Sequence, residues 1–141
     1  MAVGEVKVFL DSSVLLSASG SVKSLSRLVT VLASRRKWSL LSSGYCRAET
    51  IRNLPKLGSS ALESWPEIER GIIFVADALT SERPLLLAAG KDKPVLISAL
   101  AAECDVLLTL DRADFKIPLN TEVYGMRVET PRDFLIRQGL G

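Results

Sequence analysis

VKVFLDSSVLLSA, residues 6–18, places a single carboxylate between two apolar segments. Residues 6–10 have the composition of a buried strand, and the chain becomes apolar again after residue 13. Between the two segments lie Asp11 and the hydroxyls of Ser12 and Ser13. Because both segments favour burial, we expect the Asp11 carboxylate to be only partly solvated. A buried charge is costly without a partner, so this stretch predicts a site as well as a strand.

Predicted strands and helices alternate along the rest of the chain. Strands are predicted at 6–10, 38–43, 72–76, 106–110 and 127–129. Helices are predicted at 21–35, at 45–54, as two short turns around Pro66, at 80–89, after Pro94 and after an N-cap at Thr130. This alternation indicates βαβ units and a parallel sheet, in which sites lie beyond the carboxyl ends of the strands.

The size and composition favour one folded domain. The chain has 141 residues, of which 48% are hydrophobic and 24% charged, so a single domain spanning 1–141 is expected. No apolar run reaches the ~18 residues that a membrane span needs. The first residues, MAVGEVK, have no signal-peptide pattern. We therefore expect a soluble, cytoplasmic protein.

The residue types that are scarce exclude several kinds of site. Histidine is absent, which removes the commonest general base and transition-metal ligand. The two cysteines, Cys46 and Cys104, are too few and too far apart for a zinc site or a disulfide framework, and we interpret them as reduced core residues. Catalysis would therefore use carboxylates, hydroxyls, lysine or a hard metal ion.

Acidic residues lie near the predicted carboxyl ends of the strands or at the helices that follow. They are Asp11, Glu49, Asp92, Asp111 and Asp114. Each has a structural alternative, because aspartate is common at helix N-caps and in turns, and a helical glutamate often forms a surface ion pair. Asp77 ends the third predicted strand and so also lies at the edge of the predicted site, while a cap for the segment that starts near Thr80 is the simpler interpretation.

Several carboxylates at one edge of a sheet would need a compensating cation. Like charges at ~4 Å repel by ~1 kcal/mol in water and by several-fold more inside a protein. Ligands that offer only oxygen, without histidine or cysteine, suit Mg²⁺ or Mn²⁺. Such ions support phosphodiester hydrolysis, because they activate water and stabilise the leaving oxygen.

The sequence resembles the PIN-domain nucleases, and among them the VapC-like ribonuclease toxins. Four segments carry the resemblance in the expected order: VFLDSSVLLSA (8–18), RAET (47–50), KDKPVLISALAAECDVLLTLDRADF (91–115) and TPRDFL (130–135). The resemblance implies a three-layer α/β/α fold with a central parallel sheet of about five strands. It also implies an endoribonuclease that depends on Mg²⁺ or Mn²⁺, forms a homodimer and is neutralised by a cognate antitoxin protein.

The resemblance also implies roles for individual residues. Its four catalytic and metal-binding acids map to Asp11, Glu49, Asp92 and Asp111. Accessory positions map to Asp114, Ser12, Ser13 and Thr109. The chain departs from the family pattern at Thr50, where an apolar residue often follows the second acid, and at Asp92, which is followed by Lys-Pro.

Basic residues lie close to these acids in the sequence. The net charge is only +2, from 18 basic and 16 acidic side chains, yet it becomes about +6 once the four acids are neutralised by metal. Arg47, Arg52, Lys93 and Arg112 are candidate RNA contacts, while ordinary solvated charge is the alternative. Tyr45 is a candidate for stacking on a base or for core packing.

Two other classes of function are alternatives to a nuclease. An aspartyl phosphotransferase of the dehalogenase type needs a second aspartate two residues after the first, where this chain has Ser13. A PIN-fold module that binds RNA or protein with a degenerate site is the main alternative. A dimer or antitoxin surface is predicted at 58–71 and the final helix, with Trp65 either an anchor of that surface or a buried residue.

Overall fold

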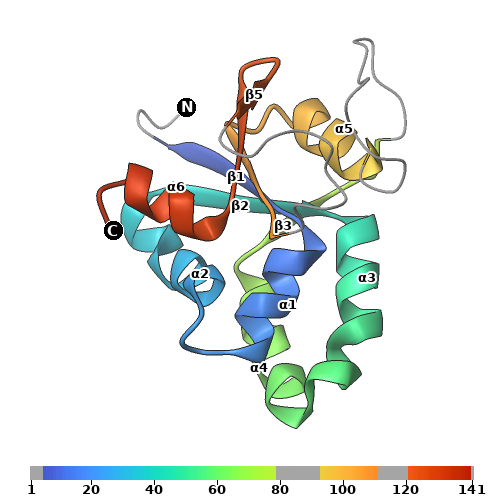
Figure 1. Ribbon diagram of the computed structural model, residues 1–141. Helices are drawn as coiled ribbons and strands as arrows, with labels where there is room; N and C mark the ends of the chain where they lie inside the picture. The colour runs from blue at the N-terminus through green and yellow to red at the C-terminus, as the bar shows by residue number, and fades with distance from the viewer. Residues whose placement is uncertain (1–4, 79–92, 111–120, 141) are drawn as a thin grey trace.

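The computed structural model describes residues 5–78, 93–110 and 121–140 and shows an α/β fold (Figure 1). The strands are β1 (Val6–Leu10), β2 (Trp38–Ser43), β3 (Ile73–Val75), β4 (Val106–Leu108), β5 (Thr121–Val123) and β6 (Met126–Glu129). The helices are α1 (Ser12–Gly20), α2 (Leu25–Arg36), α3 (Gly44–Asn53), α4 (Ser59–Arg70), α5 (Lys93–Ala101) and α6 (Pro131–Arg137), with a 3-10 helix, η1, at Leu54–Leu57.

Helices cover both faces of one sheet, which confirms the three-layer prediction. Figure 1 shows α1 to α4 on one face, with α6 beside α2, and α5 on the other face. No helix within the three described ranges is long and apolar enough to cross a membrane.

The strand order places β1 in the middle of the sheet. The order is β3-β2-β1-β4-β6-β5, and β1 is parallel to both of its neighbours. Leu10, the last residue of β1, is in register with Leu108, the last residue of β4. The N–H of Asp11 extends this pairing by donating to the carbonyl of Leu108 at 3.1 Å. The chain therefore leaves β1 at the centre of the carboxyl edge of the sheet.

The sheet has one more strand, among the described residues, than the five that were predicted. The additional strand β5 is antiparallel to β6 and forms a tight hairpin with it. Tyr124 and Gly125 connect the two strands, with φ angles of 50° and 85°. Such a turn requires positive φ at both positions, and it is usually signalled by Asn-Gly or Asp-Gly. Tyr124 is an uncommon residue for it, so the hairpin was not predicted.

Helix α1 was also not predicted, because its sequence has no polar face. Residues 12–20 contact α2, α3 and α4 as well as β1, and five of the nine side chains are buried. A helix that is covered on most sides needs no amphipathic stripe, and the 3.6-residue period is the signal that sequence reasoning uses. The predicted helix at 21–35 begins instead at Leu25, because the Ser24 hydroxyl accepts the N–H of Arg27 at 3.1 Å.

Helix α4 differs from the prediction of two short turns. It runs without interruption through Pro66, which lacks only the N–H that would bond to Leu62. Trp65 is 6% exposed and forms an edge-to-face contact with Phe74 of β3, with ring centroids 6.5 Å apart. Trp65 is therefore part of the core, so of its two predicted roles the structure confirms the buried residue and not the surface anchor.

The last helix is attached to the sheet by a buried ion pair. The Glu129 side chain is 1% exposed and accepts two hydrogen bonds from Arg137 Nε, at 3.0 and 3.1 Å, and one from Nη2 at 2.7 Å. These hydrogen bonds raise the pKa of Arg137. Nearby, Phe134 of α6 meets Trp38 of β2 edge to face, with centroids 4.8 Å apart. Thr130 begins α6 as predicted, because its hydroxyl accepts the N–H of Asp133 at 3.1 Å.

Replacing Arg137 by methionine is expected to destabilise the protein by about 2–3 kcal/mol, because the Glu129 carboxylate stays buried after losing its main partner. The double variant Glu129→Met with Arg137→Met should recover much of this loss, because no carboxylate is then buried, and Arg127, the other cation near Glu129 at 3.5 Å, has a side chain that is 32% exposed. Urea unfolding of the two variants and the wild type measures both effects. Equal destabilisation by the single and double variants would contradict this account.

Candidate functional site

The Asp11 carboxylate is buried at the junction of β1 and α1. The residue is only 4% exposed, which confirms the expectation from the sequence. Its Oδ2 atom accepts hydrogen bonds from two hydroxyls, Ser13 Oγ at 2.8 Å and Thr109 Oγ1 at 2.9 Å. Asp11 begins α1 through its backbone, because its carbonyl accepts the N–H groups of Val14 and Leu15. The Asp11 side chain makes no capping hydrogen bond to α1, and its carboxylate instead accepts the hydroxyls of Ser13 and Thr109.

The neighbouring strands fix the two hydroxyls that contact Asp11. Thr109 follows β4 and is fully buried, and its N–H donates to the carbonyl of Glu129 in β6 at 3.0 Å. The Ser13 hydroxyl is both a donor and an acceptor: its Oγ donates to Asp11 and accepts the N–H of Leu110 at 3.0 Å. The orientation of the carboxylate therefore depends on the pairing of β1 with β4 and of β4 with β6.

Helix α3 brings a second carboxylate to the same place. Glu49 is half-buried; its Oε1 accepts a hydrogen bond from the Ser12 hydroxyl, and its Oε2 accepts one from the Tyr45 hydroxyl at 3.4 Å. Because Ser12 directly follows Asp11 in the chain, this hydrogen bond holds Glu49 close to Asp11. The start of α3 lies beside the start of α1 in Figure 1, where the chain leaves β1. The structure thus brings together two of the four acids that the sequence singled out.

The position of α3 follows from β2, which pairs with β1. Ser42 Oγ donates to the carbonyl of Leu10 at 2.7 Å, and Ser43 caps α3 by accepting the N–H of Cys46 at 3.2 Å. Thr50 is fully buried, and its hydroxyl donates to the carbonyl of Cys46 at 2.7 Å. Because that hydroxyl is satisfied within the helix, Thr50 occupies the position of an apolar residue without an unpaired polar group.

Burial controls the electrostatics of the site. Desolvation raises the pKa of Asp11, and the charge of Glu49 adds to this effect, while hydrogen bonds from Ser13, Thr109 and the Ser12 N–H oppose it. Burial and the nearby charge of Asp11 raise the pKa of Cys46 to about 11. The Cys46 thiol is therefore protonated at neutral pH, which disfavours a role as nucleophile or metal ligand.

Several predicted site residues lie outside the described residues. These are Asp92, Asp111, Asp114 and Arg112, while Lys93 begins α5 without a described side chain. Within the described ranges, no group of three or more His, Cys, Asp or Glu side chains is placed to hold a metal ion. Asp11 and Glu49 offer only carboxylate oxygen, and the neighbouring groups are hydroxyls. This donor chemistry fits a hard divalent cation.

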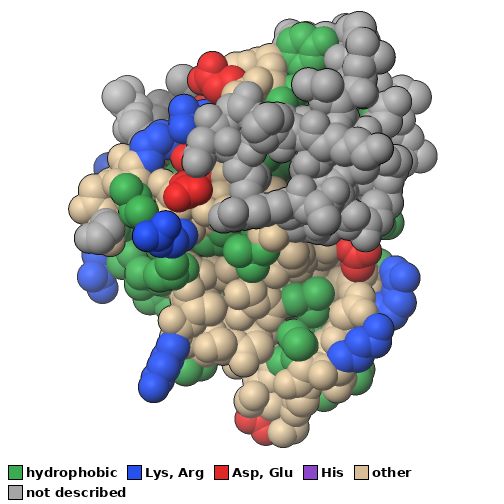
Figure 2. All heavy atoms as spheres, viewed as in Figure 1, with side chains coloured by type: hydrophobic (Ala, Val, Ile, Leu, Met, Phe, Trp, Pro, Cys, Tyr) green, Lys and Arg blue, Asp and Glu red, His purple; other side chains and the backbone are tan. Residues whose placement is uncertain are grey.

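The two basic residues of α3 differ in their surroundings. Arg47 Nε is 2.6 Å from Glu69 Oε2, and its guanidinium lies 5.8 Å from the centre of the Phe74 ring. Arg52 is exposed and has no ion-pair partner among the residues that the structure describes. Figure 2 shows basic side chains along α3 at the margin of this face. Arg52 is therefore the more available of the two cations.

Two residues near the site make contacts that the sequence does not predict. The segment near Thr80, which Asp77 is predicted to cap, lies outside the described residues; Asp77 Oδ1 accepts the N–H of Tyr45, in α3, at 2.8 Å. Tyr45 packs against the core, which confirms that alternative, and its hydroxyl also donates to Glu49. The spacing of Tyr45 and Glu49, one helical turn apart, was a usable signal for the second contact. The contact between Asp77 and Tyr45 joins residues 32 positions apart and has no local signal.

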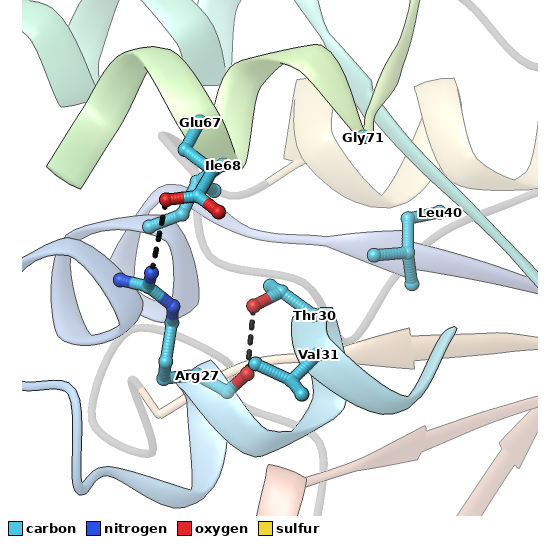
Figure 3. Close-up of a pocket in the computed structure, with 7 residues that line it drawn as sticks. All are labelled: Arg27, Thr30, Val31, Leu40, Glu67, Ile68 and Gly71. Carbon is cyan, nitrogen blue, oxygen red and sulfur yellow. Dashed lines mark hydrogen bonds and ion pairs between the residues drawn. The ribbon is translucent and has the colours of Figure 1, made fainter. Parts of the chain in front are cut away.

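A hollow of about 290 Å³ lies away from these acids, between α2, α4 and β2 (Figure 3). It is lined by Arg27, Thr30, Val31, Leu40, Glu67, Ile68 and Gly71. Figure 3 shows the Arg27 guanidinium directed at the Glu67 carboxylate, at a distance of 3.7 Å. The two charged residues that line the hollow, Arg27 and Glu67, are paired with each other, and none of the predicted site residues lines it.

Replacing Asp11 by asparagine is expected to stabilise the metal-free protein at pH 7 by on the order of 1–3 kcal/mol, the cost of a poorly solvated polar group. The asparagine oxygen still accepts from Ser13 and Thr109, but no charge is buried. Burial raises the pKa of Asp11, so the folded protein binds this proton more tightly than the unfolded chain does. The wild type is therefore most stable with respect to Asp11 below the unfolded-state pKa, and it loses this stability as the pH rises through the folded-state pKa. The advantage of Asp11→Asn should therefore disappear below about pH 4.

Urea unfolding at pH 7 and at low pH measures this difference. Asp105→Asn is the matched control, because Asp105 is exposed and also accepts a hydrogen bond, from the Lys7 N–H at 2.8 Å. It should change the free energy of unfolding by less than about 0.5 kcal/mol. A metal-free wild type that is as stable as Asp11→Asn at pH 7 would contradict the expectation.

No protein-family model and no curated protein matches the chain. Its function is therefore inferred from its own residues and from the resemblance that its segments carry.

Proposed function

We propose that this protein is a metal-dependent endoribonuclease of the PIN type, and that it acts as the toxin of a toxin–antitoxin pair. The main support is Asp11, which is 4% exposed, has its carboxylate held by two hydroxyls, and is followed by Ser12, whose hydroxyl donates to Glu49. A carboxylate so poorly solvated is costly for folding unless a cation compensates it. Its place beyond the carboxyl end of a central parallel strand is typical of functional sites.

Asp11 and Glu49 would hold Mg²⁺ or Mn²⁺, together with Asp92 and Asp111 as the resemblance implies. The ion supplies Lewis acidity for the attack of water on phosphorus. In the overall reaction, one P–O bond would form to water, the P–O bond to the ribose oxygen of the leaving RNA fragment would break, and a proton from water would reach that oxygen.

The residues around the acids orient them before substrate binds. Ser13 and Thr109 hold one oxygen of Asp11, so its carboxylate does not need to reorganise when a cation arrives. Ser12 and Tyr45 each donate to a different oxygen of Glu49. The apolar residues on both sides of Asp11 keep bulk water from this carboxylate, which strengthens electrostatic interactions there.

The substrate would be bound through its phosphate backbone. Arg52 is exposed on the helix that carries Glu49, three positions further along the chain. Phosphate contacts from such side chains position a nucleic acid without reading its sequence. A homodimer and a cognate antitoxin protein are further parts of the proposal, and they rest on the resemblance alone.

Purified protein with Mn²⁺ is expected to cleave RNA, and Asp11→Asn or Glu49→Gln should lower kcat by about 10²–10³-fold. The same loss is expected for Asp92→Asn and Asp111→Asn. Glu103→Gln is the matched control, because Glu103 is exposed in the turn before β4, at the opposite edge of the sheet, and should leave kcat unchanged. Cleavage that needs no metal, or cleavage undiminished in Asp11→Asn, would refute the proposal. Tight RNA binding without turnover or metal binding would favour the degenerate module.

Replacing Arg52 by alanine is expected to weaken RNA binding several-fold and to reduce the slope of log K against log salt by about 1. Arg47→Ala should have a smaller effect, because Glu69 already neutralises that guanidinium. Arg36→Ala, at the end of α2 where β2 begins, is the control. Titration of a catalytically inactive variant with labelled RNA at several salt concentrations measures these changes. An equal effect of Arg36→Ala would contradict the assignment.

A further inference from the structure

Asp77 connects the end of β3 to the start of α3. It follows β3 by two residues, and its Oδ1 accepts the backbone N–H of Tyr45 at 2.8 Å. Its other oxygen lies beside Gly44, where an added Cβ atom would be 3.5 Å away. The carboxylate therefore sits directly against the first residues of the helix.

Helix α3 has no acidic residue of its own in the first turn. The N–H groups at a helix start carry partial positive charge and lack partners within the helix. Ser43 accepts the N–H of Cys46, and Asp77 accepts that of Tyr45. Asp77 thus provides, from the segment after β3, an acceptor for an N–H group at the start of the helix.

Helix α5 fixes the backbone next to Asp77. Ser98 of α5 is 1% exposed, and its Oγ accepts the N–H of Ala78 at 2.9 Å and lies 3.4 Å from the Ala78 carbonyl oxygen, to which it donates. Both backbone groups of Ala78 are therefore engaged by one buried side chain. Because Ala78 directly follows Asp77, this contact limits where the Asp77 carboxylate can lie.

The first turn of α3 in turn controls Glu49. Tyr45 donates its N–H to Asp77 and its hydroxyl to Glu49 Oε2, so one residue contacts both carboxylates. We propose that Asp77 is a positioning residue for Glu49: its hydrogen bond to the Tyr45 N–H holds the start of α3 where Tyr45 and Ser12 fix the Glu49 carboxylate beside Asp11. This inference rests on the proposed function, because it assigns Glu49 a role in catalysis.

Asp77→Ala is expected to lower kcat for RNA cleavage by about 10–100-fold, because small displacements of a catalytic group have effects of this size. KM should change much less, because Asp77 does not contact the substrate. Asp77→Asn should recover kcat to within about threefold, since an asparagine oxygen can accept the same N–H. Steady-state kinetics of the three proteins in Mn²⁺ measures the effect.

Asp105→Ala is the matched control. Asp105 is also exposed and also accepts a backbone N–H at 2.8 Å, from Lys7, but it lies at the amino end of β4, the opposite edge of the sheet. Both alanine variants should lose similar stability, and only Asp77→Ala should lose kcat. An equal loss of kcat in Asp105→Ala, an unchanged kcat in Asp77→Ala, or no recovery in Asp77→Asn would overturn the inference.

A second measurement separates this inference from the proposed function. In the metal-free protein, Asp77→Ala should speed hydrogen exchange of the Tyr45 amide and shift the ¹³C resonance of the Glu49 carboxyl, whether or not the protein cleaves RNA. Asp77→Asn and Asp105→Ala should leave both signals near their wild-type values. If wild-type protein fails to cleave RNA, the proposed function fails, and these signals still decide whether Asp77 positions Glu49. Unchanged signals in Asp77→Ala overturn the inference in either case.

Discussion

The desolvation of one carboxylate, that of Asp11, is the constraint on which the rest of the site depends. Leu10 before it and Val14 and Leu15 after it are apolar and fully buried, so the carboxylate cannot move to solvent without disrupting β1 or α1. Hydroxyls compensate part of the cost, and they come from separate parts of the chain, Ser13 in α1 and Thr109 after β4. The part of the desolvation cost that the hydroxyls do not compensate raises the pKa of Asp11, and a bound cation would offset it.

The topology of the sheet explains why this constraint is met by distant residues. Because β1 is central, the chain segments that follow its neighbours β2 and β4 lie beside Asp11. The segment after β2 contributes Glu49 through α3, and the segment after β4 contributes Thr109. A strand at the edge of the sheet would have had one neighbour and could not have gathered contacts from both sides.

Much of this arrangement was predictable from the sequence, for identifiable reasons. The buried strands and Asp11 were predictable because an apolar run that ends in a charged residue is a local pattern, which a few neighbouring positions suffice to identify. Helix α1 was missed because it is covered on most sides, and β5 because its turn uses Tyr124 in place of the usual asparagine or aspartate. The contact of Asp77 with Tyr45 was not predictable, because it depends on the pairing of β2 with β3 and leaves no periodic pattern in either segment.

Glu129 has a consequence for the order in which the protein assembles during translation. Its carbonyl holds the N–H of Thr109, while its buried carboxylate binds Arg137. Arg137 follows every strand of the sheet in the chain, so it leaves the ribosome after all of them. Until then the Glu129 carboxylate lacks its main partner, although β4 and β6 have already been made. The carbonyl that holds Thr109, whose hydroxyl orients Asp11, therefore belongs to a strand whose buried charge is compensated only after α6 has left the ribosome.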